Sequence, residues 1–140
     1  MKFPVLLRSC WFGLNHLFRK RLGDLSITTV QFTVLRTISD SNHLKLSQNE
    51  IADKISCNKN NLSSIISRLE DLNYIKKLVV QSDKRVNKII LKPKGEIALK
   101  KSRRVAQKIK KQVTQDFTLK EVEQLSEYLK RCNKSIPIDS

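Results

Sequence analysis

The chain has 140 residues, and an apolar content of 39% is enough for one packed domain and excludes wholesale disorder. Its 28 Lys and Arg residues against 13 Asp and Glu residues give a formal net charge of +15. Such a charge attracts polyanions, with nucleic acid as the first candidate, although biased composition or a need for solubility could also produce it.

The sequence lacks the features that are typical of several classes of protein. No apolar run is long enough to cross a membrane, and the N-terminal stretch 3–18 is interrupted by polar residues, so we expect a cytoplasmic protein without membrane association. The three cysteines are widely spaced and only two histidines are present, which suggests neither a disulfide framework nor a metal site. We find no phosphate-binding loop and no credible catalytic arrangement, so we expect no enzyme, no catalytic residue and no cofactor.

The expected fold is mainly α-helical with a small β-hairpin, in one domain over residues 1–140. A first helix is predicted over about residues 4–21, because apolar side chains recur at helical spacing on one stripe. The members of this stripe are Leu7, Trp11, Leu14 and Phe18.

Three later helices are predicted to begin at a capping box, in which Ser or Thr precedes Glu or Gln by three residues, with apolar residues on both sides. The boxes pair Thr28 with Gln31, Ser47 with Glu50, and Thr118 with Glu121. Each box opens an apolar-periodic run, which makes these helix starts the firmest structural predictions.

A helix-turn-helix is predicted downstream of the second box. Residues 51–58 are too few for an independent helix, so they must pack on the next one, which we expect from an N-cap at Asn58 to about Leu72. Its apolar stripe is Leu62, Ile65, Ile66, Leu69 and Leu72. Its opposite face is Asn60, Asn61, Ser63, Ser64, Ser67 and Arg68.

Residues 74–81 and 88–92 are short and rich in β-branched side chains, which predicts two strands of a hairpin. The tip carries Lys84 and Arg85, with Lys88 close by, and Asp83 can pair with Arg85. Alone, a charged tip is commonly only a solvated turn. Directly after a helix-turn-helix, its cations are well placed to reach phosphates or an adjacent minor groove.

A helix of about 24 residues is predicted after Pro93, longer than the core of this domain needs. Its apolar stripe, continued in the last helix, is Ala98, Ser102, Val105, Ala106, Ile109, Val113, Phe117, Val122, Leu125 and Leu129. With the first helix, these stripes are expected to be exposed and to form a subunit interface. A basic run between residues 100 and 111 either attracts a nucleic-acid backbone or is simply solvated.

The Asn and Ser face of the second helix has the chemistry that duplex DNA requires. The major groove accepts one α-helix, Asn can pair with adenine, Ser meets several base edges, and Arg68 can reach phosphate or guanine. A face that was merely solvated would favour Lys and Glu, which are better helix formers. The predicted DNA-binding residues are Ser47, Asn58, Lys59, Asn60, Asn61, Ser63, Ser64, Ser67, Arg68, Asp83, Lys84, Arg85 and Lys88.

Four motifs in matching order and spacing show that the chain resembles MarR-type (multiple antibiotic resistance regulator) winged-helix transcription regulators from about residue 6 to residue 132. They are ITTVQFTVL at 27–35, NEIA at 49–52, RLEDLNYI at 68–75, and DKR at 83–85 followed by LKPKG at 91–95. The chain departs from the family pattern at Asn73, where Gly is usual, at Lys92, where Thr is usual, and at residues 56–57, where Gly-Val is common.

The resemblance implies a homodimer that binds an imperfect palindrome in double-stranded DNA, with a repressor as the expected role and the sign of regulation open. It implies a DNA-binding region over 27–92, with residues 58–68 in the major groove and the Asp83 and Arg85 pair on the wing. It assigns dimerisation to residues 4–22 and 93–134.

Members of the family often bind a small aromatic or lipophilic effector, or sense oxidants, between the helical arm and the winged helix. Trp11, His16 and Phe32 could line such a crevice here, and Cys10 could act as a redox sensor. The alternatives are that both aromatic residues pack in the core, that His16 is a surface residue, and that Cys10 is an inert thiol.

Two other functions stay open at this point. An architectural protein would bind all duplexes with nearly equal affinity and steep salt dependence. A winged helix that binds other proteins would expose apolar side chains on its second helix, where this chain has Asn and Ser.

Overall fold

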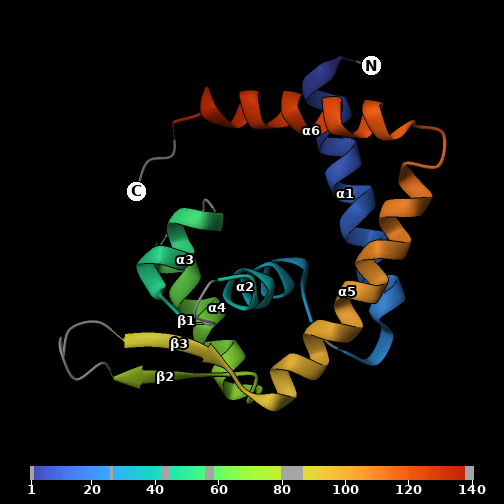
Figure 1. The fold of residues 1–140 in the computed structure, drawn as a ribbon. Coiled ribbons are helices and arrows are strands. Elements are labelled where there is room, and N and C mark those ends of the chain that lie inside the picture. Colours follow the sequence, from blue (N-terminus) through green and yellow to red (C-terminus); the bar gives the residue numbers. More distant parts are fainter. Residues whose placement is uncertain (1, 26, 42–44, 56–58, 80–86, 138–140) are drawn as a thin grey trace.

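The computed structural model describes residues 2–25, 27–41, 45–55, 59–79 and 87–137 (Figure 1). Its helices are α1 (Phe3–Leu22), α2 (Thr29–Ser39), α3 (Gln48–Ile55), α4 (Lys59–Asp71), α5 (Pro93–Val113) and α6 (Leu119–Lys134), with a 3-10 turn at Gly23–Leu25. Its strands are β1 (Lys45–Ser47), β2 (Ile75–Val79) and β3 (Asn87–Leu91). This arrangement confirms the predicted fold class, mainly α-helical with a small β-sheet.

All three predicted capping boxes form. The Thr28 hydroxyl accepts the Gln31 N–H at 3.1 Å, and the Gln31 side chain accepts the Thr28 N–H at 3.0 Å. The boxes at the starts of α3 and α6 have the same reciprocal pattern. Because a capping box satisfies two backbone donors that the helix leaves unpaired, these starts are set by local sequence.

The end of α4 also follows from a local signal. Asn73 adopts a left-handed conformation with φ of 65°, which Asn tolerates better than most residues. The N–H of Tyr74 bonds to the Leu69 carbonyl at 3.0 Å, and the N–H of Asn73 bonds to the Glu70 carbonyl at 2.9 Å. These two bonds form a Schellman motif, so the departure from Gly at position 73 leaves the helix end intact.

The sheet has a strand that the sequence analysis missed. The strand order is β1-β3-β2, and both pairings are antiparallel, with Ser47 of β1 opposite Lys88 of β3. The expected two-stranded hairpin is therefore part of a three-stranded sheet. Three residues are too few to show an alternating pattern, and their partner strand lies about 40 positions away in the sequence, so no local signal could find β1.

The core centres on α2, whose Val34, Leu35 and Ile38 are fully buried. The apolar stripe of α4 covers it as predicted: Leu62, Ile66 and Leu69 are buried, and Ile65 and Leu72 are half-buried. Strands β2 and β3 contribute Ile75 and Ile89 to the same core.

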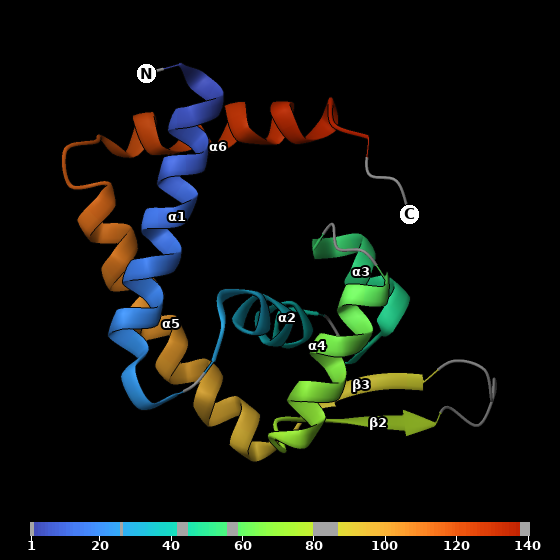
Figure 2. The same ribbon diagram turned by 180° about the vertical axis from the view of Figure 1, so that it is seen from behind.

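The prediction for the long helix was wrong in part. Helix α5 is 21 residues long, and α1 packs antiparallel along it, as Figures 1 and 2 show from opposite sides. Helix α5 also packs against α2 and β3, and Ala98, Ser102 and Ile109 are buried inside the same chain instead of being left for a partner. Val113 and Phe117, nearer the end of the stripe, stay exposed.

Helix α6 lies across the end of the molecule that holds the N-terminal part of α1 (Figure 1). None of its described side chains is buried. Its apolar face is therefore left uncovered by its own chain. None of the helices in the described ranges combines the length and apolar character that crossing a bilayer requires.

Candidate nucleic-acid interface

Helix α4 has two chemically distinct faces. Leu62 and Leu69 on one face are fully buried against the core. Every described residue of the predicted DNA-binding face is exposed: Lys59, Asn60, Asn61, Ser63, Ser64, Ser67 and Arg68. The packing of the apolar stripe therefore directs amide, hydroxyl and guanidinium groups outward, without a large apolar side chain among them.

One hydrogen bond connects this face to the start of α3, and a second holds the same Ser63 hydroxyl within α4. The Gln48 side-chain amide donates to the Ser63 hydroxyl at 2.7 Å, and the Ser63 hydroxyl donates to the Lys59 carbonyl at 3.1 Å. Sequence reasoning missed Gln48, because its partner lies 15 positions away on another helix. The bond sets the hydroxyl direction of Ser63 and connects the two helices at the exposed side.

Ser47 and Lys88, both predicted DNA-binding residues, lie opposite each other on the paired strands β1 and β3. Ser47 caps α3, since its hydroxyl accepts the Glu50 N–H at 3.1 Å. The Lys88 ammonium donates a hydrogen bond to the Glu50 carboxylate at 2.6 Å. This hydrogen bond is the main reason why the pKa of Glu50 is lowered. Lys88 is thus held by an intramolecular ion pair that joins β3 to the helix-turn-helix, which sequence reasoning did not anticipate.

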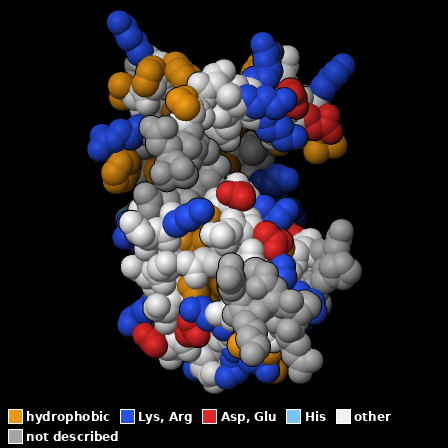
Figure 3. Space-filling model, turned by 90° about the vertical axis from the view of Figure 1, so that its left-hand side faces the viewer, with side chains coloured by type: hydrophobic (Ala, Val, Ile, Leu, Met, Phe, Trp, Pro, Cys, Tyr) orange, Lys and Arg blue, Asp and Glu red, His pale blue; other side chains and the backbone are white. Residues whose placement is uncertain are grey.

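Four predicted site residues lie outside the described residues: Asn58, Asp83, Lys84 and Arg85. Their assignment stays a prediction from the sequence. Figure 3 shows the side of the molecule on which α3 and the strand ends lie in Figure 1, with Lys and Arg side chains spread over much of the described surface.

An apolar crevice of about 370 Å³ lies between α1, α2 and α5. Trp11 and Phe32 both line it; Phe32 is also buried in the core, where its ring packs on that of Phe18 at 5.2 Å between centroids. Arg36 lies over the Phe32 ring at 5.2 Å, which brings a cation to the crevice. His16 and Cys10 are exposed on α1 and do not line it.

Apolar side chains on α1 and α6 are exposed at one end of the molecule. Trp11 and Phe12 of α1 are 55% and 59% exposed, and Leu125 and Leu129 of α6 are 44% and 36% exposed. The upper part of Figure 3, at the level of α6 and the start of α1 in Figure 1, shows hydrophobic side chains gathered there. Contiguous apolar surface of this kind is typical of an interaction site.

Within the described ranges, no group of three or more His, Cys, Asp or Glu side chains is arranged to hold a metal ion.

Comparison with known proteins finds a family model that matches part of the chain. The model of the MarR family matches residues 27–86, which contain α2, β1, α3, α4 and β2. No curated protein sequence matches the chain.

Solved structures match it over nearly its whole length. In a complex of Staphylococcus aureus MepR with DNA, the match has a TM-score of 0.88 at 20% identity and covers 97% of this chain and 99% of that one. A mutant Escherichia coli MarR bound to operator DNA matches with a TM-score of 0.82 at 23% identity, covering 92% and 91%. An organohalide-sensing transcriptional regulator in its 2,4-dichlorophenol-bound form matches with a TM-score of 0.82 at 20% identity, covering 93% and 76%. Residues 27–86 of this chain are therefore similar to the MarR family, and the whole chain has the fold of these solved structures.

Proposed function

We propose that this protein is a homodimeric, sequence-specific regulator of transcription that binds an imperfect palindrome in double-stranded DNA. Residues 27–92 would bind DNA, and residues 4–22 and 93–134 would form the dimer. The observation that carries the proposal is the exposed polar face of α4, from Lys59 to Arg68, on a chain with a formal net charge of +15.

The chemistry of that face supports a role in the major groove. Small amide and hydroxyl groups can approach base edges closely, whereas long side chains would hold the helix away. The family model covers this segment, and two of the similar structures are complexes with DNA. The wing cations Lys84 and Arg85 would contact the backbone or the minor groove beside the recognition helix.

Dimerisation is supported by apolar surface that the chain itself leaves uncovered. Helix α6 buries none of its side chains, and Trp11 and Phe12 of α1 are more than half exposed. Burying such surface against a second copy would be favourable by about 25 cal/mol for each Å² removed from water. Two recognition helices related by a two-fold axis would then read two half-sites.

We further propose that the crevice beside Trp11 and Phe32 accepts a small aromatic or lipophilic effector. Its apolar walls and the cation of Arg36 suit an aromatic ligand that carries partial negative charge. The 2,4-dichlorophenol-bound relative has the same fold. Trp11 is the only tryptophan of the chain, so its fluorescence would report such binding directly.

Selection of binding sites from random duplexes at fixed salt tests the main proposal. The expected result is an enriched inverted repeat with half-sites about 10 base pairs apart, because two helices must enter successive major grooves on one side of the duplex. Equal affinity for all duplexes would favour an architectural protein instead. No affinity for duplex DNA would favour a protein-interaction module and would overturn the proposal.

A further inference from the structure

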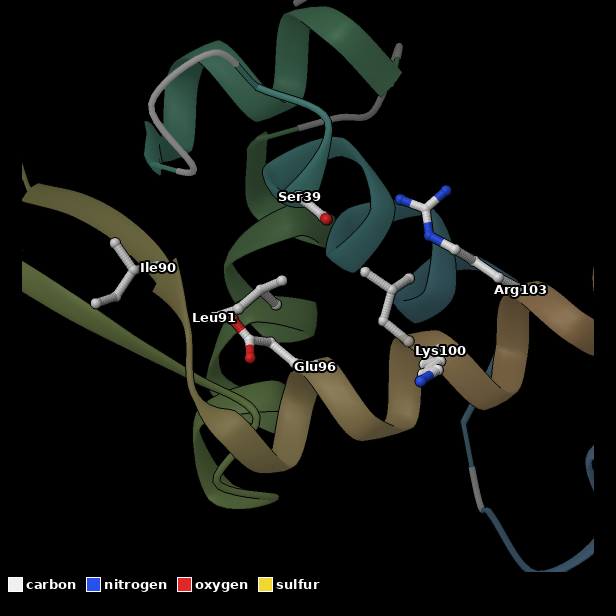
Figure 4. Close-up of a pocket in the computed structure, with 7 residues that line it drawn as sticks. Ser39, Ile90, Leu91, Glu96, Lys100 and Arg103 are labelled. Carbon is white, nitrogen blue, oxygen red and sulfur yellow. The ribbon is translucent and has the colours of Figure 1, made fainter.

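A second cavity, of about 530 Å³, lies where β3, the end of α2 and the first half of α5 meet (Figure 4). It shares no lining residue with the crevice beside Trp11. The proposed DNA-binding function makes no use of it.

The floor of this cavity is apolar. Leu99 of α5 is buried, and Ile90 and Leu91 of β3 are half-buried beside it. An apolar ligand that covered the exposed parts of Ile90 and Leu91 would displace water from apolar surface, which is favourable.

One side of the cavity is cationic. Lys100 and Arg103 of α5 line it, and Figure 4 shows the Arg103 side chain reaching toward the end of α2. Within the part of the chain that the structure describes, Lys100 takes part in none of the ion pairs. Its ammonium is therefore available to a ligand without breaking an existing contact.

Arg103 already has an ion-pair partner, which the anionic group of a ligand could replace. Its guanidinium donates to the Asp40 carboxylate at 2.7 Å, and Asp40 is the C-cap residue of α2. The two side chains are 39% and 61% exposed, so the pair is a surface ion pair and contributes about 1 kcal/mol at most. A ligand carboxylate could share or replace this partner at small cost.

The remaining lining residues restrict the charge of the ligand. Glu96 points toward β3 in Figure 4 and would repel a second negative charge, but it can accept a hydrogen bond from a donor. Ser39, at the end of α2, offers a hydroxyl that can donate or accept.

We propose that this cavity binds a small organic monoanion, with its apolar body on Leu91 and Leu99 and its carboxylate against Lys100 and Arg103. The site would join the base of the wing to the long helix α5. It is separate from the crevice beside Trp11 and from the proposed DNA-binding face.

Calorimetric titration of the free protein with 4-phenylbutanoate, and with the neutral 4-phenylbutanamide, tests this proposal. The acid is expected to bind and the amide to bind at least several-fold more weakly, because the amide cannot pair with the cations. Lys100→Gln should weaken binding of the acid by about threefold to tenfold. Asp40→Asn should strengthen it, because a competing carboxylate is removed from Arg103.

The matched control is Lys101→Gln, which makes the same change at the next residue, also exposed but not lining the cavity. It should leave the affinity unchanged, and circular dichroism would verify that all three variants keep their helical content. If Lys100→Gln and Lys101→Gln bind the acid alike, or if acid and amide bind alike, the proposal is wrong. Binding that changes Trp11 fluorescence and ignores both lysine variants would place the ligand in the other crevice, and would also overturn it.

No DNA is present in this titration. Failure of the proposed DNA-binding function would leave its result unchanged, and failure of the anion site would leave the DNA selection unchanged.

Discussion

Gly95, in the first turn of α5, lies directly against the backbone of Tyr74. A Cβ atom at position 95 would be 2.9 Å from the Tyr74 carbonyl carbon and closer still to its oxygen. The Tyr74 carbonyl oxygen also accepts a hydrogen bond from the Lys92 N–H at 2.8 Å, so the turn that follows α4 is held against the start of α5. The contact sets where the long helix leaves the winged helix.

Gly95→Ala is therefore expected to destabilise the protein by about 1 to 3 kcal/mol, because backbone atoms must move to make room. The higher helix propensity of Ala, worth about 1 kcal/mol, acts in the opposite direction and would be outweighed. Urea denaturation followed by circular dichroism would measure the change, at one fixed protein concentration because the proposed dimerisation would contribute to apparent stability.

Gly13→Ala is the matched control for that experiment. Gly13 lies within α1, and a Cβ atom there would meet nothing within 4 Å. This variant should be as stable as the parent protein or more stable by up to about 1 kcal/mol. Equal effects at the two glycines would contradict the steric explanation.

The Glu50 and Lys88 pair predicts a pH-dependent contribution to stability. The hydrogen bond from Lys88 lowers the pKa of Glu50 below its ordinary value of 4.5, so the folded protein holds the charged form more tightly than the unfolded chain does. The stabilisation is therefore present above pH 4.5 and is lost as the pH falls through the lowered pKa.

Glu50→Gln should remove this dependence while keeping the capping hydrogen bond, since Gln also serves in a capping box. Because the Glu50 side chain is 45% exposed, the loss should be no more than about 1 kcal/mol at pH 7. Denaturation of parent and variant between pH 3 and pH 7 would measure it. If the difference in unfolding free energy between parent and variant stayed constant over this pH range, the result would argue against the ion pair.

Asn61→Ala is expected to relax base preference at one position of each half-site, with a change of about 1 to 3 kcal/mol between the preferred and other bases. Asn61 is exposed on α4, so the substitution should leave the fold unchanged. Titrations of duplexes that differ at one position would measure the preference. Asn133→Ala, an exposed Asn on α6, should leave every duplex affinity unchanged. An identical base preference in parent protein and Asn61→Ala would remove Asn61 from the interface.

Leu129→Glu should shift the proposed dimer toward monomer, because it places a charge in the uncovered apolar face of α6. The side chain is 36% exposed in the single chain, so the fold of each subunit should survive. Sedimentation velocity over a range of concentrations would measure the assembly state. Lys130→Glu, at the next and also exposed position, should remain as dimeric as the parent protein. Monomeric parent protein at all concentrations would refute the dimer itself.

Local signals carried much of the fold prediction. Helix starts at Thr28, Ser47 and Thr118, and the helix end at Asn73, depend on atoms within about four residues of one another, so the sequence alone predicts them. The two faces of α4 follow from helical periodicity in the same way. The choice of Asn and Ser for the outer face, and with it the DNA-binding prediction, needs no tertiary information.

Contacts between distant segments decided the rest. Strand β1 exists because β3 pairs with it, and Lys88 meets Glu50 across 38 positions of sequence. The apolar stripe of α5 was expected to be free for a partner subunit, but α5 packs against α1, α2 and β3, and Ala98, Ser102 and Ile109 are buried within the chain. An apolar stripe predicts that one face of a helix will be covered, but it does not predict which surface will cover it, because the hydrophobic effect is not directional. The cavity beside Lys100 and Arg103 likewise arises only where three elements meet, so it belongs to the tertiary structure alone.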